Sequence, residues 1–238
     1  MNTGNIRSNT FPTSVTFPEV TIELVRTRFE YGDISTFIFK SEESISFKAG
    51  QYVHLRLSNV ASGHKAVREF SFASVPGEKE IWFSVNTRSG SPYQVALRAL
   101  VPGNKASLFK IKGEMVVPED LGAHIVLIAH GVGMAPFRAI LHDAHARDLN
   151  VDFTLVQVDK EKYLYEEEIR ELSYEQHRIT RVQLGETLEG VIQKHPGAYF
   201  FLAGSLSFVE SIKGKLIGRG VSVEKIKTDI FKGLTDDF

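Results

Sequence analysis

The residues at positions 68–74, Arg-Glu-Phe-Ser-Phe-Ala-Ser, bring a fixed positive charge, two aromatic rings and two hydroxyls together. In an extended chain alternate side chains share a face, so Arg68 and Phe70 would point one way and Ser71 the other. A guanidinium grips phosphate, and an aromatic ring stacks on a flat ligand. The pattern suits a ligand with a phosphate at one end and a flat ring at the other, such as a flavin nucleotide. The alternative is a barrel strand with its rings in the core and its Arg paired with an acid.

Two further stretches combine glycine with polar residues. Gly90 and Ser91 stand at the start of a predicted helix, where unpaired backbone NH groups and the helix dipole attract phosphate. The same residues also make an ordinary serine N-cap followed by proline. Gly50, Gln51 and Tyr52 form a glycine turn that leads into a strand, and by themselves they indicate no more than a turn.

A third glycine-rich stretch follows an apolar run in the second half of the chain. The predicted strand ends in Gly131-x-Gly133, and Pro136 stands in the first turn of a helix. The glycines would let the pyrophosphate of a dinucleotide approach the helix N-terminus. Pro136 replaces the third glycine of the usual GxGxxG fingerprint, and a tight turn without a ligand is the alternative. A second apolar strand ends at Gly204, and strand ends that face one crevice line a ligand.

The first half of the chain consists of short runs rich in Val, Ile, Phe and Thr, typical of an antiparallel β-barrel. A helix over 91–100 is expected to lie across this barrel. The six predicted strands cover residues 20–29, 33–39, 52–57, 67–73, 80–85 and 106–111.

After residue 118 apolar strands alternate with helices, which predicts a parallel, doubly wound α/β sheet. We expect strands at 124–129, 151–158, 198–203 and 221–226, and helices at 136–147, 165–172 and 208–219. Gly and Pro cluster at the change of pattern. The predicted domains are a tail at 1–17, a β-barrel domain at 18–115 and an α/β domain at 116–238.

Composition narrows the chemistry. The 238 residues include 28 Lys and Arg against 29 Asp and Glu, so the net charge of -1 favours neither nucleic acid nor an anionic membrane. The absence of cysteine excludes thiolate metal sites, cysteine-ligated clusters and cysteine nucleophiles, and no metal site is predicted. An organic cofactor must therefore hold any electrons. No apolar run has the length of a membrane span and no signal peptide is recognisable, so a cytoplasmic protein is expected.

Taken in order, these motifs resemble the ferredoxin-NADP reductase superfamily from about residue 20 to residue 234. The resemblance implies a barrel that binds FAD, in preference to FMN, joined to a domain that binds NAD(P)H. Hydride would pass from the nicotinamide to flavin N5 where the domains meet. The matching motifs are Gly50-Gln51-Tyr52, the Arg-x-Phe-Ser-x-x-Ser of residues 68–74, Gly90-Ser91, Gly131-x-Gly133-x-x-Pro136, Ala203-Gly204 and Asp229-Ile230-Phe231.

The resemblance also implies roles for single residues. Arg68 would hold the flavin phosphates, Phe70 would stack on the isoalloxazine ring, and Ser71 would lie beside N5. Ser71, Asp229 and Phe231 are the predicted catalytic residues, the last two near the other face of the flavin. The further predicted cofactor-binding residues are Gly50, Gln51, Tyr52, Ser74, Val85, Gly90, Ser91, His130, Gly131, Gly133, Pro136, Asp159 and Gly204.

Several positions depart from the pattern of the superfamily. Phe70 replaces a Tyr whose hydroxyl would bond to the ribityl chain, and a lost neutral hydrogen bond costs about 0.5 to 1.5 kcal/mol. His130, Val132, Ala203 and Asp229 stand where relatives often have Gly, Thr, Cys and Glu. His130 is either a pH-sensitive contact to the nucleotide or a residue packed at a strand end. These changes leave open a non-catalytic subunit or sensor that binds flavin or nucleotide.

The electron donor and acceptor are less well defined by the sequence. Asp159, directly after a predicted strand, suits the free ribose diol of NADH, whereas Lys160 and Lys162 leave NADPH open. Because the chain has no cluster ligands, its electrons must pass to a separate acceptor. The candidates are a small redox protein such as ferredoxin or flavodoxin, an oxygenase component, free flavin, a ferric chelate or a quinone.

Overall fold

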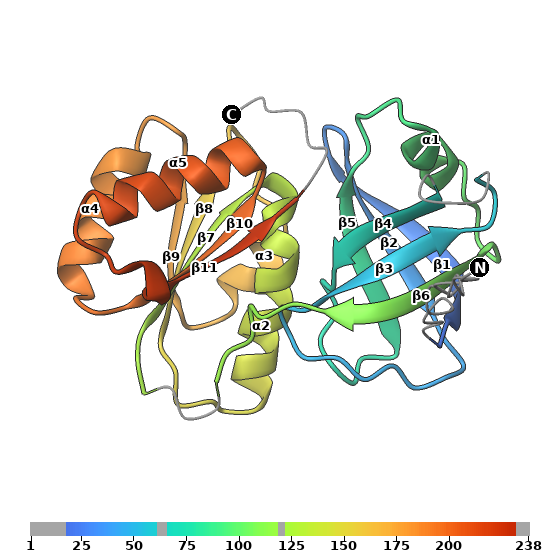
Figure 1. Ribbon diagram of the computed structural model, residues 1–238, viewed down its shortest axis with the longest axis horizontal. Coiled ribbons are helices and arrows are strands. Elements are labelled where there is room, and N and C mark those ends of the chain that lie inside the picture. Colours follow the sequence, from blue (N-terminus) through green and yellow to red (C-terminus); the bar gives the residue numbers. More distant parts are fainter. Residues whose placement is uncertain (1–17, 61–65, 119–121, 232–238) are drawn as a thin grey trace, which may run out of the picture.

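The computed structural model describes residues 18–60, 66–118 and 122–231, which form two β-sheets side by side (Figure 1). The predicted tail at 1–17 lies outside the described residues. No helix in the described ranges is long and apolar enough to cross a membrane.

The first sheet is antiparallel, with strand order β4-β3-β6-β1-β2-β5. Beyond β4 the amide of Ala73 donates to the carbonyl of Trp82 at 2.9 Å, which joins the two edge strands. The predicted antiparallel barrel is thereby confirmed. Its strands are β1 Val20–Tyr31, β2 Ile34–Lys40, β3 Tyr52–Leu57, β4 Val67–Ser71, β5 Glu80–Asn86 and β6 Lys105–Lys112.

Aromatic residues fill the barrel, because the alternation of strand side chains directs one face of each strand inward. Phe72 and Phe83 are fully buried with ring centroids 5.5 Å apart. The predicted cross-barrel helix is α1 Pro92–Arg98. Buried Tyr93 anchors this helix, since its hydroxyl donates to the carbonyl of Leu55 in β3 at 3.1 Å.

The second sheet is parallel, with strand order β11-β10-β7-β8-β9 and helices on both faces, which confirms the doubly wound α/β prediction. Leu127 faces the core that contains α2 and α3, whereas its neighbour Ile128 faces the core that contains α4 and α5. Figure 1 shows α2 and α3 on the side towards the barrel. The strands are β7 Ile125–His130, β8 Phe153–Val158, β9 Glu175–Ile179, β10 Tyr199–Gly204 and β11 Ile226–Ile230, and the helices are α2 Met134–Ala146, α3 Glu166–Arg170, α4 Leu184–Lys194 and α5 Leu206–Ile217.

The sequence prediction was wrong at both edges of this sheet. It missed β9 and α4, and it placed the last strand at 221–226, whereas β11 begins at Ile226. The residues of β9 are Glu-Gln-His-Arg-Ile, of which only Ile179 is buried. An edge strand pairs on one side only and needs fewer apolar residues, so polar composition hid both edge strands.

A buried arginine in α2 joins the two sheets. Arg138 is 4% exposed, donates to the carbonyl of Ala73 at 2.6 Å and meets both carboxylate oxygens of Glu168 at 2.5 and 3.0 Å. Its guanidinium also lies 4.2 Å from the centre of the Trp82 ring. Burial alone would raise the pKa of Glu168, but hydrogen bonds from His142 and Arg138 bring it down to about 2. The arginine is therefore paired with a carboxylate that is charged at neutral pH.

Two tyrosines add polar contacts between the same halves. The hydroxyl of buried Tyr165, from the second half, hydrogen bonds to Ser84 in the barrel and lies 3.4 Å from Thr36. The hydroxyl of Tyr31, in β1, donates to the carboxylate of Asp159 after β8 at 2.6 Å. Burial and this bond raise the pKa of Tyr31 above its ordinary range. Arg138, Tyr165 and Tyr31 thus each make polar contacts that hold the barrel against the α/β half.

The linker after β6 lies against a glycine turn of the barrel. Gly50 has φ +91°, and a Cβ at this position would overlap the carbonyl oxygen of Met115 and lie 3.0 Å from Cδ1 of Ile140. The backbone therefore requires glycine here both for its left-handed conformation and for close contact with the linker.

We predict that Gly50→Ala destabilises the protein more than Gly77→Ala. Gly77 has φ +88° but no heavy atom within 4 Å of the added Cβ, so both variants carry the left-handed strain and only Gly50→Ala adds a collision with backbone. The difference in the free energy of unfolding should be about 1 to 3 kcal/mol, measured by chemical denaturation. Equal losses in both variants would contradict the close contact with the linker.

Candidate active site

The strand that carries the predicted flavin motif has the orientation expected from its sequence. Phe70 is half-buried at one end of the barrel core, 6.0 Å from the rings of both Phe83 and Tyr93. Arg68 is exposed and lies on the same side, with its guanidinium 5.2 Å from the centre of the Tyr93 ring. A cation and an aromatic ring therefore stand together next to α1.

Ser71 points in the opposite direction, toward the other half of the molecule. Its hydroxyl donates to Oδ2 of Asp229 at 2.6 Å, across 158 residues of sequence. Phe231 follows directly after β11, is half-buried, and its amide donates to the carbonyl of Gly204 at 2.9 Å. The structure thus brings Ser71 and Asp229 into contact, with Phe231 two residues beyond Asp229.

The surroundings of Asp229 favour its protonated form. Burial raises the pKa of Asp229 and the nearby charge of Glu69 adds to the increase, while the hydrogen bond from Ser71 lowers it; the net effect is an increase. Tyr52 pairs with Ser71 in the register of β3 and β4, and its pKa is raised by burial and by the same two carboxylates. The serine hydroxyl therefore lies beside a carboxyl group that holds its proton more tightly than an exposed aspartate does.

The glycine turn after β7, residues 131–133, is held by packing against other backbone of the protein. A Cβ on Gly133 would overlap the carbonyl of Ala203 and lie 3.0 Å from the amide nitrogen of Gly204. Gly131 has φ +54°, and Gly204 has φ +156° with the ring of Phe208 only 2.9 Å from an added Cβ. The turns that follow β7 and β10 are therefore packed backbone to backbone at the carboxyl ends of these two strands.

His130, directly before this turn, is half-buried with its ring 5.3 Å from that of Phe208. This ring contact matches one of the two roles considered for His130, that of a residue packed at a strand end. Pro136 lies in the first turn of α2, as predicted, and is buried. Asp159, expected to hold a ribose, uses Oδ2 for the Tyr31 hydroxyl and Oδ1 for the amide of Lys160 at 2.8 Å.

The other predicted cofactor-binding residues have structural contacts within or beside the barrel. Gly50 packs on the linker, and the side chain of Gln51 accepts from the amide of Lys48 at 2.8 Å. Ser91 is the N-cap of α1, where its hydroxyl accepts from Gln94 at 3.4 Å, beside exposed Gly90. The buried ones are Ser74, whose hydroxyl accepts from the amide of Trp82 at 3.2 Å, and Val85, which faces the barrel core.

The sequence analysis missed the side chains that hold the two halves together, which are Arg138, Trp82, Tyr165 and Tyr31. One signal was present, because Arg138 interrupts an otherwise apolar run in α2. Such a charge is almost never buried without a partner. Its partners come from distant segments, so the sequence does not identify them.

Comparisons with known proteins find similarity to flavohemoproteins and to ferredoxin-NADP reductases. No model of a protein family matches it. It is 23% identical to the flavohemoprotein of Bordetella pertussis over 88% of this chain and 60% of that protein, so the chain spans about three fifths of that relative. It is 31% identical to the ferredoxin-NADP reductase of Pseudomonas aeruginosa over 45% of this chain and 42% of that protein.

Two solved structures share the arrangement of both sheets. One is a flavohemoglobin from Malassezia yamatoensis with bound FAD and heme, with a TM-score of 0.74 at 18% identity over 90% of this chain and 60% of that one. The other is a ferredoxin NADP+ reductase from Neisseria gonorrhoeae with bound FAD and NADP, with a TM-score of 0.75 at 18% identity over 89% and 98%. The chain has the ferredoxin-NADP reductase fold. The fold that the order of its motifs implied is confirmed.

In this reductase fold the raised pKa of Asp229 predicts how stability depends on pH. The folded protein keeps this proton above pH of about 3.9, where an unfolded aspartate loses it. Stability should therefore fall as pH rises through the interval up to the folded pKa, and then level off. Asp229→Asn cannot ionise and should lack this fall, as measured by chemical denaturation from pH 4 to pH 8.

Ser71→Ala supplies the matching control for that experiment. Removing the hydroxyl takes away the hydrogen bond that lowers the pKa of Asp229, so the fall in stability should extend to higher pH. Identical pH profiles for the native protein and Asp229→Asn would contradict the assignment.

Proposed function

We propose that the chain is an NAD(P)H-dependent flavoprotein reductase that passes hydride to bound FAD and then electrons to a separate acceptor. The hydrogen bond between Ser71 and Asp229 is the observation that carries this proposal. It joins a strand of the barrel to a strand of the α/β sheet and places a proton donor pair at their junction. The ferredoxin-NADP reductases and the oxygenase reductase component among the relatives support the same activity.

The barrel has side chains that fit FAD. Exposed Arg68, next to the N-terminal part of α1, can grip phosphate through two parallel hydrogen bonds. The half-buried ring of Phe70 offers a flat apolar surface beside Tyr93. When bound, FAD supplies the ring that accepts the two electrons of a hydride and later releases them. We assign Arg68 to its phosphates and Phe70 to the ring, within a flavin unit of residues 18–115.

Ser71 and Asp229 would donate or accept the proton that accompanies electron transfer. In the structure the serine hydroxyl donates to Asp229. If Asp229 is protonated, this bond can reverse, and the serine hydroxyl would then accept from Asp229 and donate to a nitrogen or oxygen at the edge of a bound ring. The raised pKa of Asp229 makes that protonated form more accessible, and burial keeps bulk water from competing for the proton. Phe231 follows directly after β11 and would cover the reacting face.

The second unit, residues 116–238, would bind the nicotinamide nucleotide at the edge where β7 and β10 end. Strand ends at this edge of a doubly wound sheet and the helix N-terminus that follows form the usual position for a dinucleotide. We assign its pyrophosphate to the Gly131–Gly133 turn and favour NADH, with Asp159 at the ribose. Asp159 would then exchange its bond with Tyr31 for the ribose diol.

We propose that the electrons pass to an acceptor that lies outside the described residues. The chain has no cysteine, and its described residues contain no group of three potential metal ligands. The relatives include reductases named for ferredoxin and for a terephthalate dioxygenase system. A small redox protein or an oxygenase component is therefore the acceptor that we propose.

We predict that Arg68→Ala weakens FAD binding by about 10- to 150-fold, which corresponds to the loss of hydrogen bonds to a charged group. Flavin fluorescence titration of the purified chain measures this change. Arg170→Ala, an exposed arginine of α3 paired with Glu166, is the matched control and should bind FAD normally. Normal FAD affinity in Arg68→Ala would remove the assignment of the phosphate site.

The activity itself is tested by adding NADH or NADPH to the FAD-loaded chain without oxygen and following the visible absorption of the flavin. We expect rapid bleaching, faster with NADH, and a roughly 100-fold slower reaction in Ser71→Ala. Flavin that binds but stays oxidised with both donors would contradict the reductase. That result would favour the non-catalytic subunit. The departures at His130, Val132 and Ala203, near the proposed nucleotide site, support that alternative.

A further inference from the structure

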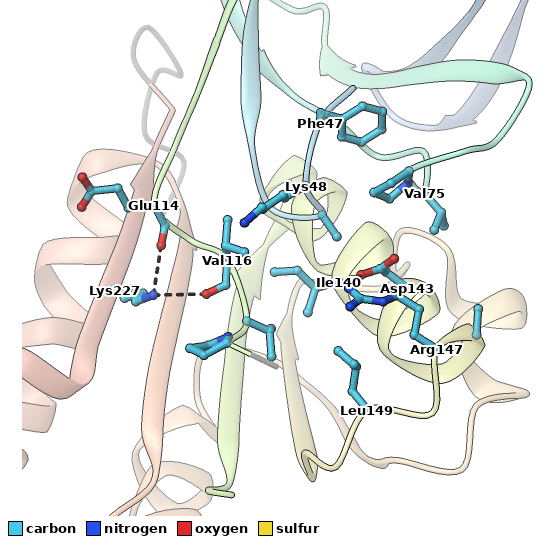
Figure 2. A pocket seen from close by; sticks show the side chains of 15 residues that line it. Phe47, Lys48, Val75, Glu114, Val116, Ile140, Asp143, Arg147, Leu149 and Lys227 are labelled. Carbon is cyan, nitrogen blue, oxygen red and sulfur yellow. Dashed lines mark hydrogen bonds and ion pairs between the residues drawn. The ribbon is translucent and has the colours of Figure 1, made fainter. Parts of the chain in front are cut away.

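A cavity of about 620 Å³ opens between the barrel, the linker and α2 (Figure 2). Its volume lies within the range of roughly 300 to 1,000 Å³ that is typical of small-molecule sites. None of its lining residues is among those assigned above to flavin or nucleotide. They are Phe47, Lys48, Ala49, Val75, Pro76, Glu114, Val116, Val117, Pro118, Ile140, Asp143, Ala146, Arg147, Leu149 and Lys227.

The walls of this cavity are mostly apolar and come from both halves of the molecule. Phe47 and Val75 belong to loops of the barrel, Ile140 belongs to α2, Leu149 follows that helix, and Val116 belongs to the linker. Figure 2 shows the Phe47 ring above the cavity and Ile140 and Leu149 across from it. An apolar body bound here would touch the barrel, the linker and the α/β half at once.

Two of the three cations around the cavity already have partners. The ammonium of Lys227 donates to the carbonyls of Glu114 and Val116 at 3.0 and 3.2 Å. Arg147 pairs with Asp143 at 3.3 Å. The Lys227 contacts hold the linker on β11, and the Arg147 pair lies at the end of α2.

Lys48 is the cation that remains. Its exposed side chain lines the cavity and points toward the linker (Figure 2). No described residue pairs with its ammonium. With three cations against the two carboxylates of Glu114 and Asp143, the lining carries one excess positive charge. An anionic group with an apolar body matches both the charge and the walls.

We propose that this cavity binds a small organic carboxylate with a flat apolar body, such as a two-ring aromatic acid. The carboxylate pairs with Lys48, and the rings lie between Phe47 and Ile140. Because the walls come from both halves and from the linker, the bound acid stabilises their arrangement. A ligand that binds only the folded protein raises its unfolding temperature.

The test uses 2-naphthoate and its uncharged analogue 2-naphthamide, titrated by calorimetry into the full chain with and without saturating FAD. We expect saturable binding of the naphthoate, a higher unfolding temperature, and at least about fivefold weaker binding of the amide. Saturating FAD should leave the affinity unchanged. The readout is binding, so it stands or falls separately from hydride transfer.

Two variants identify the site. Lys48→Met should weaken naphthoate about fivefold, whereas Lys79→Met, an exposed lysine outside the cavity, should not change it. Ala146→Phe fills the cavity from the end of α2 and should abolish binding of both compounds. Displacement of naphthoate by FAD, equal affinity for the amide, or unchanged binding in Lys48→Met and Ala146→Phe would each overturn the proposal.

Discussion

The buried charge of Arg138 is the constraint on which the arrangement of the two halves depends. A guanidinium at 4% exposure is tolerated only with full compensation, and here Glu168, the Ala73 carbonyl and the Trp82 ring supply it. Ala73 belongs to the same stretch as Ser71. The hydrogen bond from Arg138 to the Ala73 carbonyl therefore also helps to fix the position of Ser71 relative to the sheet that carries Asp229.

Close backbone contacts make this arrangement precise. Gly50 lets the barrel lie directly on the linker, and Gly133 lets the turns after β7 and β10 touch. Neither contact has room for a Cβ, so the glycines are explained without a ligand. In this fold the same compact turns leave helix N-termini beside the carboxyl ends of the strands, where a nucleotide would bind. Both the packing of the turns and the binding of a nucleotide therefore favour glycine at these positions.

The cavity beside the linker is a second candidate binding site between the same two halves of the molecule. In the candidate active site the two halves are joined by the hydrogen bond between Ser71 and Asp229. The cavity, which includes Lys48, has apolar walls that come from both halves. Lys227 and Asp229 are alternate residues of β11, so both regions lie along one strand. A ligand in the cavity would therefore act on the element that carries the acidic partner of Ser71.

The sequence by itself determined the two sheet types, the domain order and the opposite orientations of Phe70 and Ser71, because periodicity and glycine placement are local properties. It also pointed to Ser71 and Asp229 through the order of motifs. Only the tertiary structure decided that these two side chains touch and that Asp159 bonds to Tyr31. The sequence also did not reveal the polar edge strands or the partners of Arg138, since both depend on contacts between residues far apart in the chain.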